Sequence, residues 1–228
     1  MSLRKDLSGF LKLPESFFHI PAPAEGEPDV GVLGVPYDLT SSYMPGCRFA
    51  PDAIRRATTG ERSHSTPLTI GSSPSPEQRF LSEVLTLEDI GDLEVTNRLP
   101  DAAMYDISDA AQKLARRRSF LLFLGGDHFI TYPLLKGLKR GRQGKYGVVW
   151  LDAHADFYPD YGGYQLSHAT SLRRCVDAGL VRVEDVLAYD VRSALSEQRM
   201  ELSGTNIIQY HTTESFQKAA QKIADRTE

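Results

Sequence analysis

Two short apolar runs constrain the fold of this chain more than any other feature, because each leads directly into a turn of polar, ligand-type residues. Residues 120–124 lead into Gly-Gly-Asp-His at 125–128, and residues 147–151 lead into Asp-Ala-His-Ala-Asp at 152–156. The length and the β-branched or aromatic content of both runs are typical of buried parallel strands. In open α/β sheets the ligand crevice lies at the carboxyl ends of such strands, so we expect the two polar turns to meet there.

The second turn carries three alternating side chains that could hold a metal ion. Every second side chain of an extended segment shares a face, so Asp152, His154 and Asp156 can converge past the strand end. His128 would join them from the end of a neighbouring strand. Carboxylates with one or two imidazoles suit Mn²⁺, Fe²⁺, Co²⁺ or Zn²⁺, and the share of carboxylates favours manganese. The structural alternative is that both aspartates cap the next helix and His154 packs in the core; the combined pattern favours metal.

Strand and helix patterns alternate along most of the chain. This alternation predicts an α/β fold: a three-layer, doubly wound, mostly parallel sheet with helices on both faces. We expect a single domain over residues 29–228, preceded by an N-terminal arm, residues 1–28, whose prolines break regular structure. The acidic segment 88–92 lacks histidine, so it is interpreted as a solvated turn and not as a metal motif. Residues 206–209 are predicted to form a strand. Thr213 is predicted to cap the last helix.

Composition excludes several classes of partner. The 228 residues carry a formal net charge of -4 and a pI near 5.9, which argues against nucleic-acid binding, since phosphate contacts need a basic face. No apolar run approaches the length of about 20 residues that a membrane span needs. Cys47 and Cys175 lie far apart and are interpreted as free thiols in a reducing compartment, so we expect a cytoplasmic protein.

At these motifs the sequence resembles the ureohydrolase family, the agmatinases and arginases, from about residue 29 onward. The resemblance rests on the Gly-Gly-Asp-His and Asp-Ala-His-Ala-Asp turns, on Ser167-His168, and on Pro-Gly-Cys-Arg-Phe-Ala-Pro at 45–51. The loop 157–167 is more similar to the agmatinase branch than to the arginase branch. An arginase-like fold is what the resemblance implies.

The resemblance also implies a reaction. Family members hydrolyse a guanidinium group, here most simply that of agmatine, to urea and an amine, by means of a hydroxide that bridges two Mn²⁺ ions. The implied metal ligands are His128, Asp152, His154 and Asp156, with Asp152 bridging. Asp156 and His168 are the candidate catalytic residues, and His168 would relay protons or protonate the leaving amine; alternatively it only hydrogen-bonds a loop. Related enzymes are commonly trimers or hexamers, so we expect a homo-oligomer.

One departure from the family pattern affects these expectations. The third metal motif of the family, Asp-x-Asp on a late strand, is absent before Glu228. We therefore expect a C-terminally incomplete domain with an unpaired sheet edge, in which one manganese ion or fewer binds tightly and hydrolysis is impaired. The alternatives are a non-catalytic homologue or fragment that serves as a binding or assembly partner, and another metal hydrolase such as a phosphoesterase. In the loop before residue 51, Arg48 or Asp38 either contacts substrate or only ties the loop down.

Overall fold

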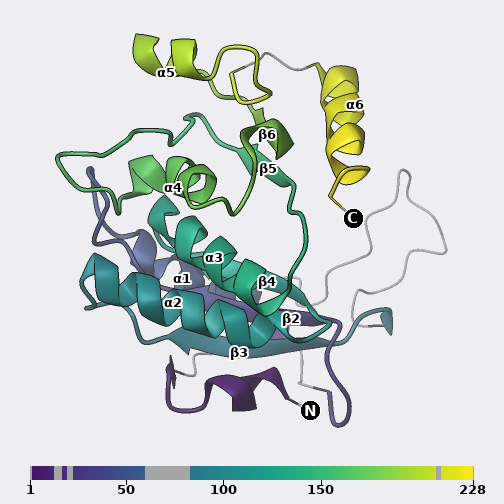
Figure 1. The fold of residues 1–228 in the computed structure, drawn as a ribbon. Helices are drawn as coiled ribbons and strands as arrows, with labels where there is room; N and C mark the ends of the chain where they lie inside the picture. Colours follow the sequence, from purple (N-terminus) through teal and green to yellow (C-terminus); the bar gives the residue numbers. More distant parts are fainter. Residues whose placement is uncertain (1, 13–16, 20–22, 60–82, 209–211, 228) are drawn as a thin grey trace.

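The computed structural model describes residues 2–12, 17–19, 23–59, 83–208 and 212–227 (Figure 1). Their strands form two sheets. One sheet has the order β1-β3-β2-β4, and the other pairs β5 with β6. Only β1 is antiparallel to its neighbour, so the expected α/β fold with a mostly parallel sheet is confirmed. The strands are β1 (Leu11–Lys12), β2 (Val30–Val35), β3 (Leu87–Leu93), β4 (Phe120–Gly125), β5 (Val148–Leu151) and β6 (Val186–Tyr189).

Helices cover both faces of the four-stranded sheet, because alternate side chains of β2 pack against different helices on opposite faces. Leu33 and Val35 pack into the main core with α2, whereas Val32 joins a smaller cluster that Phe17 covers from the opposite face. Gly34 shares that second face and lies against Pro51 of α1. This alternation follows from the two-residue period of a strand. The helices are α1 (Ala50–Thr59), α2 (Pro100–Ala115), α3 (Thr131–Gly141), α4 (Ser171–Asp177), α5 (Ser196–Glu201) and α6 (Thr213–Ala224).

The two strands that lead into the polar turns are not paired, which differs from the expectation that His128 ends a strand next to β5. Within the described residues β4 pairs only with β2, and β5 pairs only with β6. An apolar cavity of about 430 Å³ separates them, with Phe123, Leu135 and Trp150 in its lining. The α3 and α4 helices pack on β5 and β6 in a second core, so they hold the two sheets together (Figure 1).

The N-terminal arm forms more regular structure than its prolines suggested. The 3-10 helix η1 (Leu3–Leu7) buries Leu3 and Leu7 completely in the main core, β1 pairs with β3, and η2 (Phe17–His19) lies against α1. Prolines interrupt hydrogen bonding only where they stand, so the short segments between them remain free to pack. The arm therefore packs on the body of the domain.

The acidic segment 88–92 is not a solvated turn: it lies inside β3, and every residue of that strand is buried. Arg55 of α1 explains how the charges are accommodated. Its Nε lies 2.8 Å from Asp89 Oδ2, and its Nη1 lies 2.6 Å from Asp92 Oδ1, while its own side chain is 0% exposed. Buried charges persist when they are paired and hydrogen-bonded. Sequence reasoning failed here because the compensating cation stands more than thirty residues away.

Two smaller predictions at the C-terminal end are also corrected. Residues 206–208 form no strand, although the Asn206 carbonyl accepts a hydrogen bond from the Ala188 N–H beside β6; residue 209 lies outside the described residues. The last helix begins at Thr213, but Thr212 caps it, since its hydroxyl accepts the Ser215 N–H at 3.2 Å. Among the described helices, none has the length and apolar character that a membrane crossing requires. Both cysteines are free.

Gly126 is required where the turn after β4 meets the loop after β2. A Cβ at this position would lie 2.0 Å from the Tyr37 carbonyl oxygen, which is backbone and cannot move aside alone. We expect Gly126→Ala to lower the free energy of unfolding by about 2–3 kcal/mol in denaturant titrations. Gly125→Ala is the matched control, because its Cβ meets only the end of the flexible Ile130 side chain. Equal losses for both variants would contradict this explanation.

Candidate metal centre

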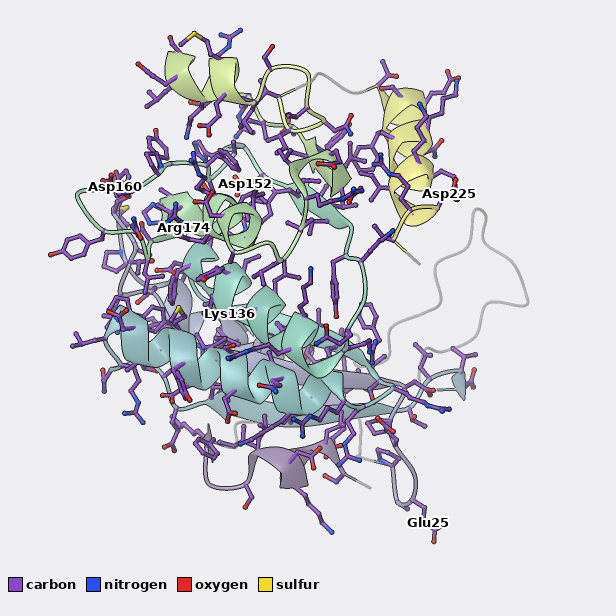
Figure 2. The ribbon with its side chains drawn as sticks, in the orientation of Figure 1. Glu25, Lys136, Asp152, Asp160, Arg174 and Asp225 are labelled. Carbon is purple, nitrogen blue, oxygen red and sulfur yellow. The ribbon has the colours of Figure 1, made fainter. Side chains whose placement is uncertain are left out.

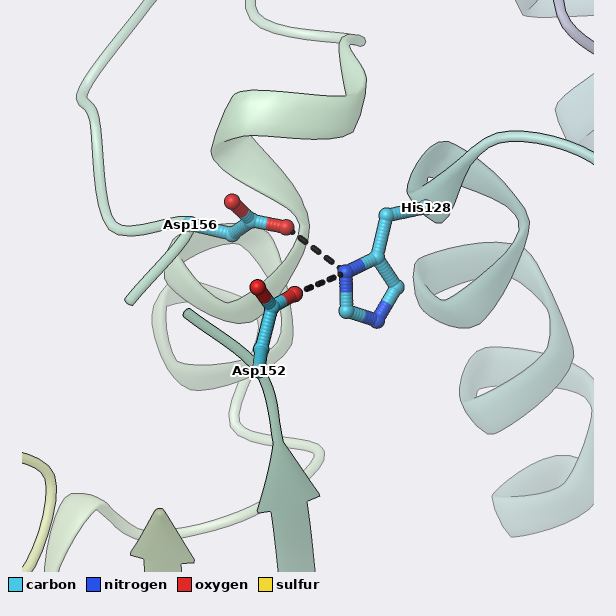
Figure 3. Close-up of side chains that lie close together, drawn as sticks. All are labelled: His128, Asp152 and Asp156. Atoms are coloured by element: carbon cyan, nitrogen blue, oxygen red, sulfur yellow. Dashed lines mark ion pairs between the residues drawn. The ribbon is translucent and has the colours of Figure 1, made fainter. Parts of the chain in front are cut away.

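His128, Asp152 and Asp156 converge on one point (Figure 3). His128 Nδ1 lies 2.9 Å from Asp152 Oδ2 and 2.8 Å from Asp156 Oδ2. One ligand-type atom from each residue falls within 4.8 Å of the other two. The two aspartates follow β5 and the histidine follows β4, so the centre joins the carboxyl ends of strands from two different sheets.

The local structure around His128 directs its ring toward the carboxylates. His128 opens the 3-10 helix η5 (His128–Ile130), which Asp127 caps by accepting the Phe129 N–H at 3.1 Å. The Trp150 ring stacks on the imidazole with centroids 4.3 Å apart and planes 19° apart. Ser171 Oγ donates to the His128 carbonyl at 2.8 Å, which ties this turn to α4. The ring is therefore held by packing on one side and by the carboxylates on the other.

Asp156 reaches the centre through an unusual backbone conformation. Its φ is +46°, in the left-handed region that residues other than glycine rarely adopt. Its carboxylate is buried and its carbonyl accepts the Arg173 N–H at 3.3 Å. Strain of this kind costs roughly 1–3 kcal/mol and persists where surrounding contacts impose it, often at functional sites. Figure 2 shows Asp152 inside the fold, whereas Asp160 of the same connection lies at its outer edge.

Electrostatics at the centre favour a charged Asp152 carboxylate beside a His128 ring that carries a proton. Burial alone would lower the pKa of His128, but its hydrogen bonds to Asp152 and Asp156 outweigh burial and raise that pKa to about 9. Burial opposes ionisation of Asp152, yet the His128 hydrogen bond holds the pKa of this carboxyl below its usual value. Two carboxylates facing one imidazole nitrogen form a donor set that suits a manganese ion once that nitrogen loses its proton.

The fourth predicted ligand, His154, is not brought into this group. Its side chain is 64% exposed, and its Nδ1 lies 3.6 Å from Asp152 Oδ1. Its backbone forms an isolated parallel bridge to Ser193 instead, and its N–H donates to Asp152 Oδ1 at 2.9 Å. The strand ends at Leu151 and residues 152–153 form a bend, so the strict strand alternation that predicted three ligands on one face does not hold here.

His168 lies at the start of η6 (His168–Thr170), which packs against η5 beside the centre. Ser167 caps this short helix, and Nε2 of His168 lies 3.3 Å from Ser42 Oγ. Tyr161 contacts the ring edge-on, with centroids 5.4 Å apart. Ser42, Tyr161 and Ser167 also line a cavity of about 660 Å³. His168 therefore lies on a helix that packs beside the metal centre, and its ring contacts two residues that line the cavity.

The contacts of Arg48 and Asp38 lie within the loop that carries them. Arg48 Nε pairs with Asp38 Oδ1, and Asp38 Oδ2 also accepts the Gly46 N–H at 2.7 Å. Asp38 is 1% exposed, and these hydrogen bonds outweigh burial and lower the pKa of its carboxyl. The pair therefore ties the loop down.

Sequence reasoning missed four residues around the centre and the neighbouring cavity: Thr40, Asp101, Asp127 and Trp150. Trp150 appears in sequence only as part of an apolar run, and Thr40 carries no motif of its own. Asp101 follows a proline at a helix start, where an acidic residue is ordinary. Only Asp127 could have been found, because it belongs to the Gly-Gly-Asp-His turn.

Comparison with known proteins finds one family over most of the chain. The sequence model of the family described as "Arginase family" matches residues 28–228. An agmatinase from Bacillus cereus is 30% identical over 206 residues, which cover 90% of this chain and 67% of the agmatinase. A guanidinobutyrase from Pseudomonas aeruginosa is 30% identical over 188 residues, covering 82% of this chain and 60% of that enzyme. The chain thus spans about two thirds of the length of these relatives.

The fold has counterparts among solved structures. The crystal structure of a hypothetical agmatinase from Burkholderia thailandensis superposes with a TM-score of 0.74 at 25% sequence identity, over 91% of this chain and 64% of that one. This likeness confirms the expected arginase-like fold. The named relatives are hydrolases, which does not favour a non-catalytic homologue.

Proposed function

Because this chain belongs to the arginase family, we propose that it hydrolyses the guanidinium group of agmatine, with manganese held by His128, Asp152 and Asp156. The observation that carries the proposal is the convergence of these three side chains, whose ligand-type atoms lie within 4.8 Å of one another. Carboxylate and imidazole donors at the carboxyl end of parallel strands are what a hydrolytic manganese site needs.

The chemistry explains why a metal is required. A guanidinium is stabilised by resonance and is a poor electrophile, so water must be activated at neutral pH. A divalent cation at this centre would supply that activation by lowering the pKa of bound water to near 7. The paired carboxylates of Asp152 and Asp156 keep the centre negative, and Trp150 excludes solvent from one face of His128. His168 would exchange protons with the leaving amine through Nε2.

The cavity beside His168 supports agmatine rather than a substrate with a terminal carboxylate. Asp101 is the charged side chain among its described lining residues, and no lysine or arginine is among them. Tyr161 and Tyr164 add aromatic faces, which attract cations. The distal ammonium of agmatine can pair with Asp101, whereas the carboxylate of guanidinobutyrate would meet a like charge there.

The proposal is tested by metal content and product release measured on the same preparation. We expect one Mn²⁺ per chain by elemental analysis after dialysis, and urea release from agmatine above that from arginine or guanidinobutyrate. Formiminoglutamate, assayed by its own product, completes the panel. His154 stays a proposed ligand of a second, weaker site, so His154→Asn should leave the tight stoichiometry unchanged. A chain that binds manganese but releases product from none of these substrates would overturn the proposal.

Asp101 provides a separate test of substrate choice. We expect Asp101→Asn to lower the ratio of kcat/KM for agmatine to that for guanidinobutyrate by about fivefold, the size of an exposed ion pair. Asp109→Asn on the same helix is the control, because Asp109 pairs with Lys113 and does not line this cavity. An unchanged ratio in Asp101→Asn would remove the argument for agmatine while leaving the metal centre intact.

A further inference from the structure

Asp127, which precedes His128, turns away from the metal centre and binds the loop after β2. Its Oδ2 accepts two hydrogen bonds from Thr40, one from the N–H at 3.0 Å and one from the hydroxyl at 2.7 Å. Its own N–H donates to the Tyr37 carbonyl at 2.7 Å, the close approach that requires Gly126. Asp127 is 7% exposed, so these hydrogen bonds occupy a buried carboxylate.

Thr40 in turn holds His168 at two points. The His168 N–H donates to Thr40 Oγ1 at 3.1 Å, and His168 Nδ1 lies 2.6 Å from the Thr40 carbonyl oxygen. The Thr40 hydroxyl therefore accepts from the backbone of His168 while it donates to Asp127. Loss of that hydroxyl would break both of its hydrogen bonds. Only the backbone contacts of Thr40 with Asp127 Oδ2 and His168 Nδ1 would remain, so the loop would hold the His168 ring less firmly.

The second of these contacts fixes the chemical form of the ring. A carbonyl oxygen can only accept, so the proton of a neutral His168 ring must reside on Nδ1. Nε2 then keeps its lone pair and accepts from Ser42 Oγ at 3.3 Å. Ser42 and Tyr161 line the adjacent cavity, so the free lone pair lies on the cavity side of the ring.

We propose that Thr40 and Asp127 are positioning residues for His168: they hold its ring in the Nδ1–H tautomer with Nε2 available to a ligand in the cavity. The turn that carries residues 127 and 128 would thus serve two functions. His128 lies at the metal centre, and Asp127 orients His168 through Thr40. The task of Nε2 in proton transfer rests on the proposed function, but the ring geometry does not.

The geometric claim is tested without turnover. Histidine ¹⁵N NMR at pH 8.5, with His168→Gln to assign the signals, should show the Nδ1–H tautomer in the unmodified chain. Thr40→Val, which has the same shape without the hydroxyl, should shift both ring ¹⁵N signals toward the average of the two tautomers. Thr40→Ser should keep the single tautomer. An Nε2–H ring in the unmodified chain, or identical spectra for all three proteins, would overturn the proposal.

Kinetics test the consequence for catalysis. We expect Thr40→Val to lower kcat for agmatine about 10- to 100-fold, as misplacement of a catalytic group does, with KM within about twofold because the cavity lining keeps its shape. Thr40→Ser should recover most of kcat. A loss in Thr40→Ser as large as in Thr40→Val would contradict the role of the hydroxyl. If the unmodified chain releases no urea, the proposed function fails, and the tautomer measurement still decides the positioning claim.

Discussion

Replacing Arg55 with methionine is expected to lower the free energy of unfolding by about 3–5 kcal/mol. The Arg55 side chain is 0% exposed and pairs with Asp89 and Asp92, so its removal leaves two buried carboxylates without a cation. Burial already raises the pKa of Asp92, against the opposing effect of Arg55. The measurement is equilibrium unfolding in denaturant at pH 7, monitored by fluorescence and circular dichroism.

Arg56→Met is the matched control. Arg56 is the next residue on the same helix, and it pairs with Asp52, but its side chain is 72% exposed. An exposed pair of this kind contributes less than about 1 kcal/mol, so Arg56→Met should leave stability nearly unchanged. Similar losses for the two variants would show that burial of the Arg55 cluster does not determine its contribution.

Asp152→Asn is expected to weaken Mn²⁺ binding more than about 100-fold and to abolish turnover. Loss of a residue that only supports a metal ligand costs roughly 10- to 100-fold in affinity, and a direct ligand should cost more. The substitution also removes one of the two carboxylates that face His128 Nδ1. Isothermal titration calorimetry with MnCl₂ measures the affinity, and it does so whether or not the chain turns over substrate.

Asp160→Asn serves as the control for this experiment. Asp160 lies on the connection after the metal centre, is exposed, and accepts the Gly163 N–H at 3.0 Å, which an asparagine oxygen can also do. Its manganese affinity should match that of the unmodified chain. Unchanged affinity in Asp152→Asn would show that the three converging side chains do not form the metal site.

The fold class followed from local patterns because strand and helix periods report directly on burial. The runs before residues 125 and 152 are apolar and bounded by polar turns, and both are strands. A buried charge that is paired with a residue far away in the sequence leaves no such local pattern. The acidic segment of β3 looked solvated because its partner, Arg55, approaches only when α1 packs on the sheet.

The candidate site was predictable because its residues follow the ends of two buried strands, β4 and β5. Asp152, Asp156 and His128 were expected to converge, and the structure brings them together. His154 was expected with them by strand alternation, but β5 ends at Leu151, the chain bends at residues 152–153, and His154 is left exposed. Where a strand ends and bends depends on how it packs in the fold, so periodicity alone does not reveal it.

The sequence by itself determined the residue types of the centre, their position after two buried strands, and the α/β class. Only the tertiary structure decided that these strands belong to different sheets, that Thr40 hydrogen-bonds both Asp127 and His168, and that Asp101 lines the neighbouring cavity. The physical reason is the sequence distance over which each kind of interaction acts. Periodicity encodes which face of one element is buried, whereas hydrogen bonds between residues more than eighty positions apart depend on how the elements pack.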